Sequence, residues 1–229
     1  MPDRIAVVTG GAGAIGTAIT RVLQGTGHRT VVLDRNADVD CDLSSEASTR
    51  AAAATVLERH GRCDVLVHCA AVFDRAAIAD LDAATWRRVQ AVNVESALWL
   101  VQAFAPGMAQ RRFGRIVFIA SDTVWGPPNP AMLAYIASKG ALLGVMRTLA
   151  VTLGADGIGV SAVAPGLTDT PDARARNGDE HFGAVVRRQA LKRPLTPGDT
   201  AAAVAYLVSD AAAAMTGQVL CADGGLIMR

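Results

Sequence analysis

Short apolar runs alternate with longer segments of helical periodicity along the whole chain. The apolar runs lie at residues 5–9, 29–33, 65–68, 115–120, 159–163 and 218–221. Most lack strict polar alternation, as expected for strands that are covered on both faces of a sheet. The helical patterns lie between them, at residues 14–26, 45–60, 83–110, 134–154 and 198–209. This alternation predicts an α/β fold, a doubly wound parallel sheet of the Rossmann type in an α/β/α sandwich.

The pattern contains no internal repeat and no linker, so one domain is expected over residues 1–229. Residues 171–197 are the exception, because they carry three prolines and many charges. Such a segment is typical of a loop or short-helix insertion that covers a substrate site.

Composition narrows the class of protein. The chain has 229 residues, of which 51% are hydrophobic and 19% are charged, with a formal net charge of +1. These values suit one soluble globular domain and give no reason to expect a nucleic-acid or membrane partner. The N-terminus lacks a secretory pattern, and no apolar run is expected to reach membrane-spanning length. The four cysteines lack metal-ligand spacing, so they are interpreted as reduced thiols of a cytoplasmic protein without a metal site.

A glycine-rich segment, TGGAGAIG at residues 9–16, follows the first predicted strand and opens the first helix. Gly11, Gly13 and Gly16 fit the GxGxxG pattern. Glycines at these positions permit a tight turn and let the backbone approach a pyrophosphate at the helix N-terminus. The alternative is a structural turn rich in glycine, but the strand–turn–helix context favours a dinucleotide site.

Asp34 ends the second predicted strand, 18 residues after Gly16. A carboxylate at this distance binds the adenosine ribose hydroxyls and repels a 2′-phosphate, which favours NAD over NADP. Arg35 follows directly and offers a cation to such a phosphate, and a strand-end Asp also serves turns. Asp42, Ser44 and Ser45 are alternative caps for the next helix.

Tyr135 and Lys139 lie four residues apart in a predicted helix and therefore share one face. A nearby ammonium favours the phenolate and lowers the pKa of a tyrosine, which suits acid–base chemistry on an alcohol or carbonyl. Tyrosine and lysine at this spacing are also common on solvated helix faces.

The chain resembles the short-chain dehydrogenase/reductase family, in its compact single-domain branch, from residue 5 to the C-terminus. The resemblance is carried by the glycine loop, Asp34, Asn93, Ser121, Tyr135 and Lys139, in that order. It implies that Tyr135 is the catalytic acid/base, that Lys139 lowers its pKa and binds the nicotinamide ribose, and that Ser121 polarises the substrate oxygen. Asn93 would hold a water that connects Lys139 to solvent, and Thr123 is the less favoured alternative to Ser121.

The same resemblance implies a set of cofactor contacts. Asp42 would contact adenine, Ala70 and Ala71 would lie along the adenosine, and Thr170 of the PGxxxT-like segment would face the nicotinamide carboxamide. The full implied set is Gly10, Gly13, Ala14, Ile15, Gly16, Asp34, Asp42, Leu43, Ala70, Ala71, Tyr135, Lys139, Pro165, Gly166 and Thr170.

Two departures from the compact pattern lie at Ala14, where a glycine is usual, and at residues 68–71, where HCAA replaces NNAG. Both are typical of the extended branch, which includes epimerases and dehydratases. The chain length and the C-terminal DGG segment favour the compact branch. His68 and Cys69 are interpreted as packed strand-end residues.

The expected activity is hydride transfer between a secondary alcohol or ketone and a nicotinamide cofactor. Alternatives are an epimerase or dehydratase that retains NAD, and a non-catalytic regulator that binds NAD. The resemblance also suggests a homotetramer or dimer built from the helices at 83–110 and 134–154.

The substrate is left open. Trp125, Met132 and Leu133 line an apolar pocket or only pack a loop. The basic residues within 172–193 recognise an anionic group or form a solvated charged segment, and the interleaved acidic residues favour the second interpretation.

Overall fold

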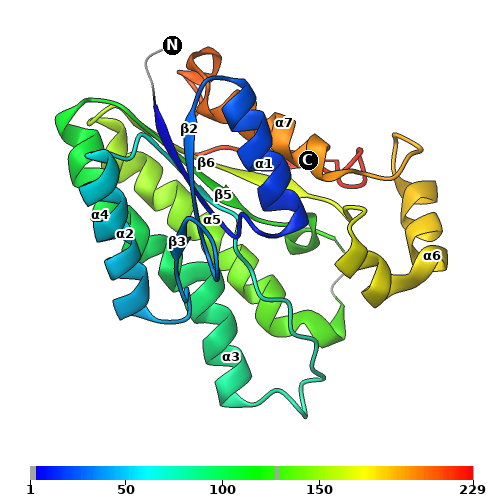
Figure 1. Ribbon diagram of the computed structural model, residues 1–229. Coiled ribbons are helices and arrows are strands. Elements are labelled where there is room, and N and C mark those ends of the chain that lie inside the picture. The colour runs from blue at the N-terminus through cyan, green and yellow to red at the C-terminus, as the bar shows by residue number, and fades with distance from the viewer. Residues whose placement is uncertain (1–3, 127–128, 229) are drawn as a thin grey trace.

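The computed structural model describes residues 4–126 and 129–228. Its seven parallel strands form one sheet in the order β3-β2-β1-β4-β5-β6-β7. Figure 1 shows this sheet between layers of helices. The strands are β1 (Ile5–Thr9), β2 (Arg29–Asp34), β3 (Val39–Asp40), β4 (Val65–His68), β5 (Gly114–Ile119), β6 (Ile158–Pro165) and β7 (Val219–Ala222). The predicted strands are confirmed within one or two residues at most ends. The two-residue β3 was not predicted, because so short a strand has no periodicity.

Helices cover both faces of this sheet (Figure 1). On one face, α1 (Ala14–Gly25) packs beside α7 (Pro197–Val208). On the other face lie α2 (Glu46–His60), α4 (Ser96–Gln110) and α5 (Leu133–Gly154). The shorter α3 (Ala83–Gln90) packs against α5, and α6 (Pro171–Arg188) projects from the end of the sheet.

The first strand shows why its sequence lacks polar alternation. Ala6 and Val8 pack into a core with α1 and α7, whereas Ile5 and Val7 pack into a second core with α2, α4 and α5. All four side chains are buried. Both faces of β1 are therefore apolar, and the doubly wound fold is confirmed.

Two predicted segments differ from the structure in their detail. The helix expected at 83–110 is divided by a π-helical stretch, Ala91–Glu95, which inserts an extra residue per turn around Asn93. The segment expected to be a loop or short helices begins with α6, capped by Thr170, whose hydroxyl accepts from the Ala173 backbone N–H. A positive φ of 72° at Gly178 kinks α6 into two parts.

One helical stretch, Pro130–Gly154, is long and apolar enough to span a membrane by length and composition. The expectation that no apolar run reaches that length is therefore wrong. This stretch contains α5, which packs against β6 and buries the charged residue Lys139. A packed helix that also serves as a core element can reach the same hydropathy without a membrane.

The strand order reverses between β1 and β4, the point at which doubly wound sheets bind ligands beyond the carboxyl ends of their strands. The segments that follow β1, β2, β4, β5 and β6 all meet at this edge. The fold therefore gathers the glycine loop, Asp34, residues 69–71, Ser121 and Gly166 at one end of the sheet.

Candidate functional site

A cleft of about 1210 Å³ lies at the carboxyl end of the sheet. Every cofactor contact that the resemblance implies lines this cleft: Gly10, Gly13, Ala14, Ile15, Gly16, Asp34, Asp42, Leu43, Ala70, Ala71, Tyr135, Lys139, Pro165, Gly166 and Thr170. Ser121 lines it too, whereas Asn93 is not among its lining residues. Residues that are far apart in the sequence are thus brought to one surface, although their individual roles stay predictions.

The glycine loop requires glycine at two positions for steric reasons. Gly10 has a φ of +69°, and a Cβ there would lie 2.7 Å from the Ala70 Cα atom. A Cβ on Gly16 would lie only 2.1 Å from the Gly10 carbonyl oxygen. Real Cβ atoms are not found at such distances, so both glycines let the chain pass close to its neighbours.

The N-terminus of α1 fits a dinucleotide pyrophosphate. Gly13 is its N-cap residue, and within the described chain no side chain caps the helix and its first turn carries no acidic residue. The first N–H groups of a helix are strong donors to anions, and the macrodipole adds positive potential there. A Cβ on Gly13 would meet only the Gly10 carbonyl at 3.4 Å, so the space beside the helix end is open.

Asp34 is placed between the second strand and the glycine loop. Its Oδ2 atom accepts from the Ala12 backbone N–H at 3.1 Å, and its Oδ1 atom accepts from the Arg35 N–H at 2.8 Å. These bonds hold the carboxylate at the cleft wall with further lone pairs free for ribose hydroxyls. Arg35 lines the same wall, so the two residues that bear opposite cofactor preferences lie side by side.

Asp42 makes a turn and does not cap the next helix. Its Oδ1 atom accepts from both the backbone N–H and the hydroxyl of Ser44, and these bonds lower the pKa of its carboxyl. Ser45 is the N-cap of α2 and accepts from the Ser48 N–H at 3.3 Å. Of the three alternative caps, Ser45 is the one that the structure shows.

The HCAA segment is supported by Thr9. The Thr9 hydroxyl accepts from the backbone N–H groups of Cys69 and Ala70, both at 3.1 Å. His68 is fully buried, and its Nε2 atom lies 2.8 Å from the Ser96 hydroxyl. Burial lowers the pKa of His68 to about 3, so the ring is neutral at physiological pH. The interpretation of His68 as a packed strand-end residue agrees with this geometry.

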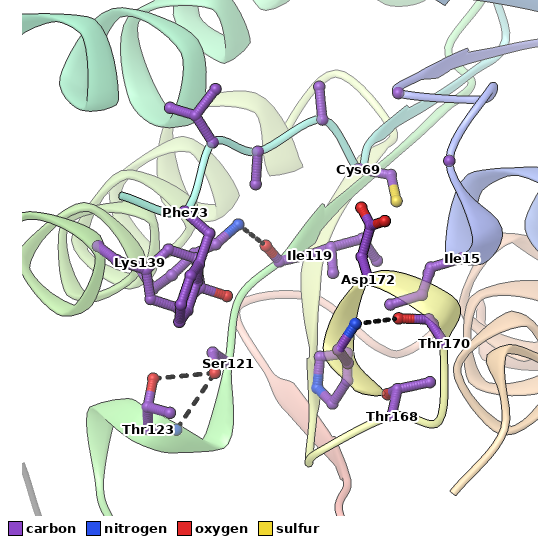
Figure 2. A pocket seen from close by; sticks show the side chains of 18 of the residues that line it. Ile15, Cys69, Phe73, Ile119, Ser121, Thr123, Lys139, Thr168, Thr170 and Asp172 are labelled. Carbon is purple, nitrogen blue, oxygen red and sulfur yellow. Dashed lines mark hydrogen bonds between the residues drawn. The ribbon is translucent and has the colours of Figure 1, made fainter. Parts of the chain in front are cut away.

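Ser121, Tyr135 and Lys139 meet where β5 ends and α5 begins. The Lys139 ammonium donates to the Ile119 carbonyl at 2.7 Å and lies 5.6 Å from the centroid of the Tyr135 ring. The Ser121 hydroxyl accepts from the Thr123 hydroxyl at 2.9 Å and from its N–H at 3.3 Å, as Figure 2 shows. Thr123 also lines the cleft, but its hydroxyl is tied to Ser121.

Burial controls the ionisation of this group. It raises the pKa of Tyr135 to about 12, against a smaller lowering effect of a hydrogen bond with Ser121. It also lowers the pKa of Lys139 to about 8. The pKa of Tyr135 is therefore raised in the protein alone, contrary to the lowering expected beside Lys139, because desolvation of the phenolate is the largest influence on it.

Asn93 lies on the π-helical stretch and is fully buried. Its Oδ1 atom accepts from the Val72 N–H at 2.8 Å, and its Nδ2 atom donates to the Val72 carbonyl at 3.1 Å and to the Ser138 hydroxyl at 2.9 Å. The side chain thus joins the loop after β4 to α5 behind the Tyr135–Lys139 pair. The water relay implied by the resemblance stays a prediction.

Gly166 and Thr170 border the cleft after β6. A Cβ on Gly166 would lie 2.9 Å from the Asp223 Cα atom, so glycine is required for this close approach. The Thr170 hydroxyl lines the cleft while it caps α6, accepting from the Ala173 N–H at 3.1 Å. If Thr170 contacts a carboxamide as predicted, the same hydroxyl oxygen must serve both that contact and the helix cap.

Of the two alternatives for Trp125, Met132 and Leu133, a pocket lining applies to Met132 alone within the described residues. Met132 is buried and lines the cleft, whereas Leu133 is 43% exposed and does not. Trp125 packs against the core on the α4–α5 side of the sheet.

Two residues of the site escaped the sequence analysis. The Phe73 ring meets the Tyr135 ring edge-on, with their centroids 4.5 Å apart. Asp122 is buried beside Ser121, and burial raises the pKa of its carboxyl to about 6, with a further contribution from Asp223. Asp122 could have been predicted as part of the site, because its carboxyl directly follows the predicted serine. The position of Phe73 in the sequence gave no indication that its ring lies beside Tyr135.

Among the residues that the structure describes, no cluster of three or more His, Cys, Asp or Glu side chains forms a metal site. Within the described part of the chain, no disulfide joins Cys41, Cys63, Cys69 or Cys221.

Comparisons with known proteins agree with this geometry. A family model described as enoyl-(acyl carrier protein) reductase matches residues 10–227. The chain is 32% identical to the 3-oxoacyl-(acyl-carrier-protein) reductase MabA of Mycobacterium tuberculosis, covering 99% of this chain and 94% of that protein. It is 33% identical to the L-tagatose-forming galactitol 2-dehydrogenase of Cereibacter sphaeroides, covering 96% and 93%.

A solved structure shares the fold closely. It is a Beutenbergia cavernae protein assigned as an NAD(P)-dependent gluconate 5-dehydrogenase, with NADP bound at low occupancy. The TM-score is 0.90 at 32% identity, covering 97% of this chain and 96% of that one. The chain therefore belongs to the short-chain dehydrogenase/reductase family of NAD(P)-dependent oxidoreductases.

Proposed function

We propose that this protein is a dehydrogenase or ketoreductase that interconverts a secondary alcohol and a ketone, with NAD preferred over NADP. The observation that carries the proposal is the convergence of Ser121, Tyr135 and Lys139 on the same cleft that the glycine loop borders. A cleft with a few convergent polar groups and strongly perturbed pKa values is typical of an active site.

The chain's own residues would handle the substrate oxygen and its proton. In oxidation, Ser121 donates a hydrogen bond to the alcohol oxygen, and the Tyr135 phenolate takes the hydroxyl proton as the carbonyl bond forms. The carbinol C–H bond breaks, and its electron pair leaves with the hydrogen as hydride. A bound nicotinamide supplies the hydride acceptor. In reduction, Tyr135 donates the proton, and its raised pKa keeps the phenol protonated before that step.

Lys139 would stabilise the phenolate by electrostatic attraction, with its ammonium held by the Ile119 carbonyl. The pKa of Lys139 is lowered only to about 8, so its ammonium form still predominates at neutral pH. A positive charge at this position is most effective where water is excluded, since the effective dielectric constant is low there.

The preference for NAD rests on Asp34. Its carboxylate is held at the cleft wall by the Ala12 N–H, and a 2′-phosphate there would meet a negative charge. Arg35 is the feature that opposes this preference. The cofactor comparison is therefore part of the test.

The test is steady-state NADH absorbance with purified protein. Secondary alcohols are assayed with NAD⁺ and NADP⁺, and ketones with NADH and NADPH. We expect turnover with NAD(H) that falls by about 100- to 10,000-fold or more in Tyr135→Phe. The chain has one other tyrosine, Tyr206, which is 44% exposed on α7 and provides the matched control Tyr206→Phe. A fully active Tyr135→Phe variant would overturn the assignment.

Dinucleotide binding is measured in parallel by NADH fluorescence, and it should survive Tyr135→Phe. Tight NAD retained through purification, with no net NADH release, would instead support the NAD-retaining isomerase or dehydratase alternative. Binding without any turnover would favour the regulator.

We also propose that the chain is a cytoplasmic homo-oligomer, a tetramer or dimer formed through α4 and α5. The exposure of Val151, 85% on the apolar helix α5, supports a covered surface there. A monomer by light scattering at micromolar concentration would contradict this.

A further inference from the structure

The basic residues of the segment 174–193 are not equivalent in the structure. Arg174 is paired with Asp169 and Asp179, and Arg193 is paired with Asp199. Lys192 donates to the backbone carbonyls of Arg187 and Gln189. Only Arg176 and Arg188 line the cleft. Much of this charge is therefore neutralised or turned away from the site, as the solvated interpretation expects, but Arg176 and Arg188 are exceptions. Of the two, Arg176 is the one that lies over the Phe73 ring.

Arg176 lies close to the proposed acid/base. Its guanidinium carbon is 5.4 Å from the centroid of the Phe73 ring, and that ring meets Tyr135 edge-on at 4.5 Å. The positive charge is near enough to act on the Tyr135 hydroxyl, whose pKa it lowers. Among the described residues, the one carboxylate that pairs with it is Asp172 at 3.9 Å, which is too far for a hydrogen bond.

Arg75 uses both of its terminal nitrogens on α6 beside Arg176. One terminal nitrogen of Arg75 donates to the Asn177 side-chain oxygen at 2.7 Å, and the other donates to the Arg176 carbonyl at 3.4 Å. Its guanidinium carbon lies 5.5 Å from the same Phe73 ring. The loop after β4 is thus tied to α6 beside the cleft, while the Arg176 fork stays open.

Two acidic side chains that line the cleft, Asp122 and Asp172, leave Arg176 without a hydrogen-bonded carboxylate. The Asp122 carboxyl is bonded to Ser121 and Thr123 and interacts with Asp223, all on the β5 and β7 side. Asp172 lies on α6 itself and is the weak partner of Arg176. Arg88, another cation at the mouth, is neutralised by Asp74. Uncompensated positive charge therefore remains on α6, at Arg176 and Arg188, and at Arg75 beside it, whose hydrogen-bond partners are neutral oxygens.

We propose that Arg176 binds a carboxylate of the substrate, so that the substrate class is hydroxy acids and the corresponding oxo acids. This inference rests on the proposed function, because it names the substrate of the same site. One open guanidinium fork matches the two oxygens of a carboxylate and balances its single charge. Arg176 would displace Asp172 and hold the acid while its hydroxyl or carbonyl carbon faces Tyr135.

The test compares acids with their neutral analogues. A series of 2-, 3- and 4-oxo acids is assayed with NADH, each against its methyl ester. We expect kcat/KM to favour one acid over its ester by about 10- to 100-fold, the range of a charged hydrogen-bonded pair. In Arg176→Gln this preference should fall toward unity, mainly through a higher KM for the acid, and Arg176→Lys should restore part of it.

Arg187→Gln is the matched control, because Arg187 is an exposed residue of the same helix that does not line the cleft. It removes the same charge and should keep the preference. Equal use of acids and esters by the wild-type protein would overturn the proposal, and so would an equal loss in both variants. Preference for a phosphorylated ketone or a neutral oxo thioester over every acid would overturn the carboxylate assignment.

A binding arm separates this inference from the proposed function. Butyrate and butyramide are titrated calorimetrically into NADH-saturated protein. Butyrate should bind more tightly than butyramide, and Arg176→Gln should abolish the difference while Arg187→Gln keeps it. If no ketone or alcohol is turned over but this difference is present, the proposed reaction fails and the Arg176 site stands. If turnover is found but the difference is absent, the Arg176 site fails alone.

Discussion

Asp122→Asn should make the protein more stable, and more so as the pH rises. The Asp122 side chain is buried next to Ser121, in a residue that is only 7% exposed. Burial raises the pKa of its carboxyl from 3.8 to about 6, and the negative charge of Asp223 adds to this. Because the folded state holds this proton more tightly than the unfolded state, its stabilising effect is complete below pH 3.8 and is lost as the pH rises through 6.

The size of the effect follows from the two pKa values. A rise from 3.8 to about 6 corresponds to about 3 kcal/mol of folding free energy lost at pH 8, and about half of that is already lost at pH 5. Asparagine imitates the protonated carboxyl at every pH. The variant should therefore gain about 3 kcal/mol at pH 8 and about 1.5 kcal/mol at pH 5.

The assay is urea unfolding of both proteins at pH 5 and pH 8, with the change in midpoint multiplied by a common m-value. Asp80→Asn, at an exposed turn, is the control and should change the free energy of unfolding little at either pH. An equal gain at both pH values, or a loss at pH 8, would refute the reasoning, because a steric or hydrogen-bonding effect of the amide does not follow the titration of one carboxyl.

Three further substitutions test other parts of the site. Gly16→Ala would place a Cβ 2.1 Å from the Gly10 carbonyl oxygen, so the loop must move and NADH binding, followed by fluorescence titration, should weaken by about tenfold or more. Asn93→Ala leaves the partly buried Val72 N–H without its acceptor and should cost about 1–3 kcal/mol in urea unfolding, whereas no loss would contradict the bond. Lys139→Met should lose turnover yet gain more stability at pH 7 than at pH 9.5, because burial lowers the pKa of the lysine to about 8 and the buried charge is costly below it. A smaller gain at pH 7 than at pH 9.5 would contradict this reading.

Local patterns predicted most of the elements. Apolar runs identified six of the seven strands, because strands buried on both faces have little alternation and are easy to separate from helices by length. The sequence offered Asp42, Ser44 and Ser45 as alternative N-caps of α2 without a choice among them. Asp42 and Ser45 both have a suitable acceptor, and only the turn geometry decides between them.

The candidate site was predicted as a set of residues but not as an electrostatic environment. Helical spacing placed Tyr135 and Lys139 on one face, and the structure agrees. The direction of the Tyr135 pKa shift was wrong, because it depends on burial by segments far away in the sequence. The proximity of Phe73 and Arg176 to Tyr135 has the same cause, since the loop after β4 and α6 meet only in the folded chain.

Periodicity and residue type were enough to predict the succession of strands and helices along the chain, the glycines of the tight loop, and the chemical groups at the ends of the strands. These depend on the periodicity and steric size of neighbouring residues, which are local properties. The folding of remote segments against one another settled which groups lose their water, which arginines pair with a carboxylate, and that Arg176 lies open near Tyr135. Desolvation and Coulomb energies depend on distances between segments that are remote along the chain, so no spacing in the sequence contains them.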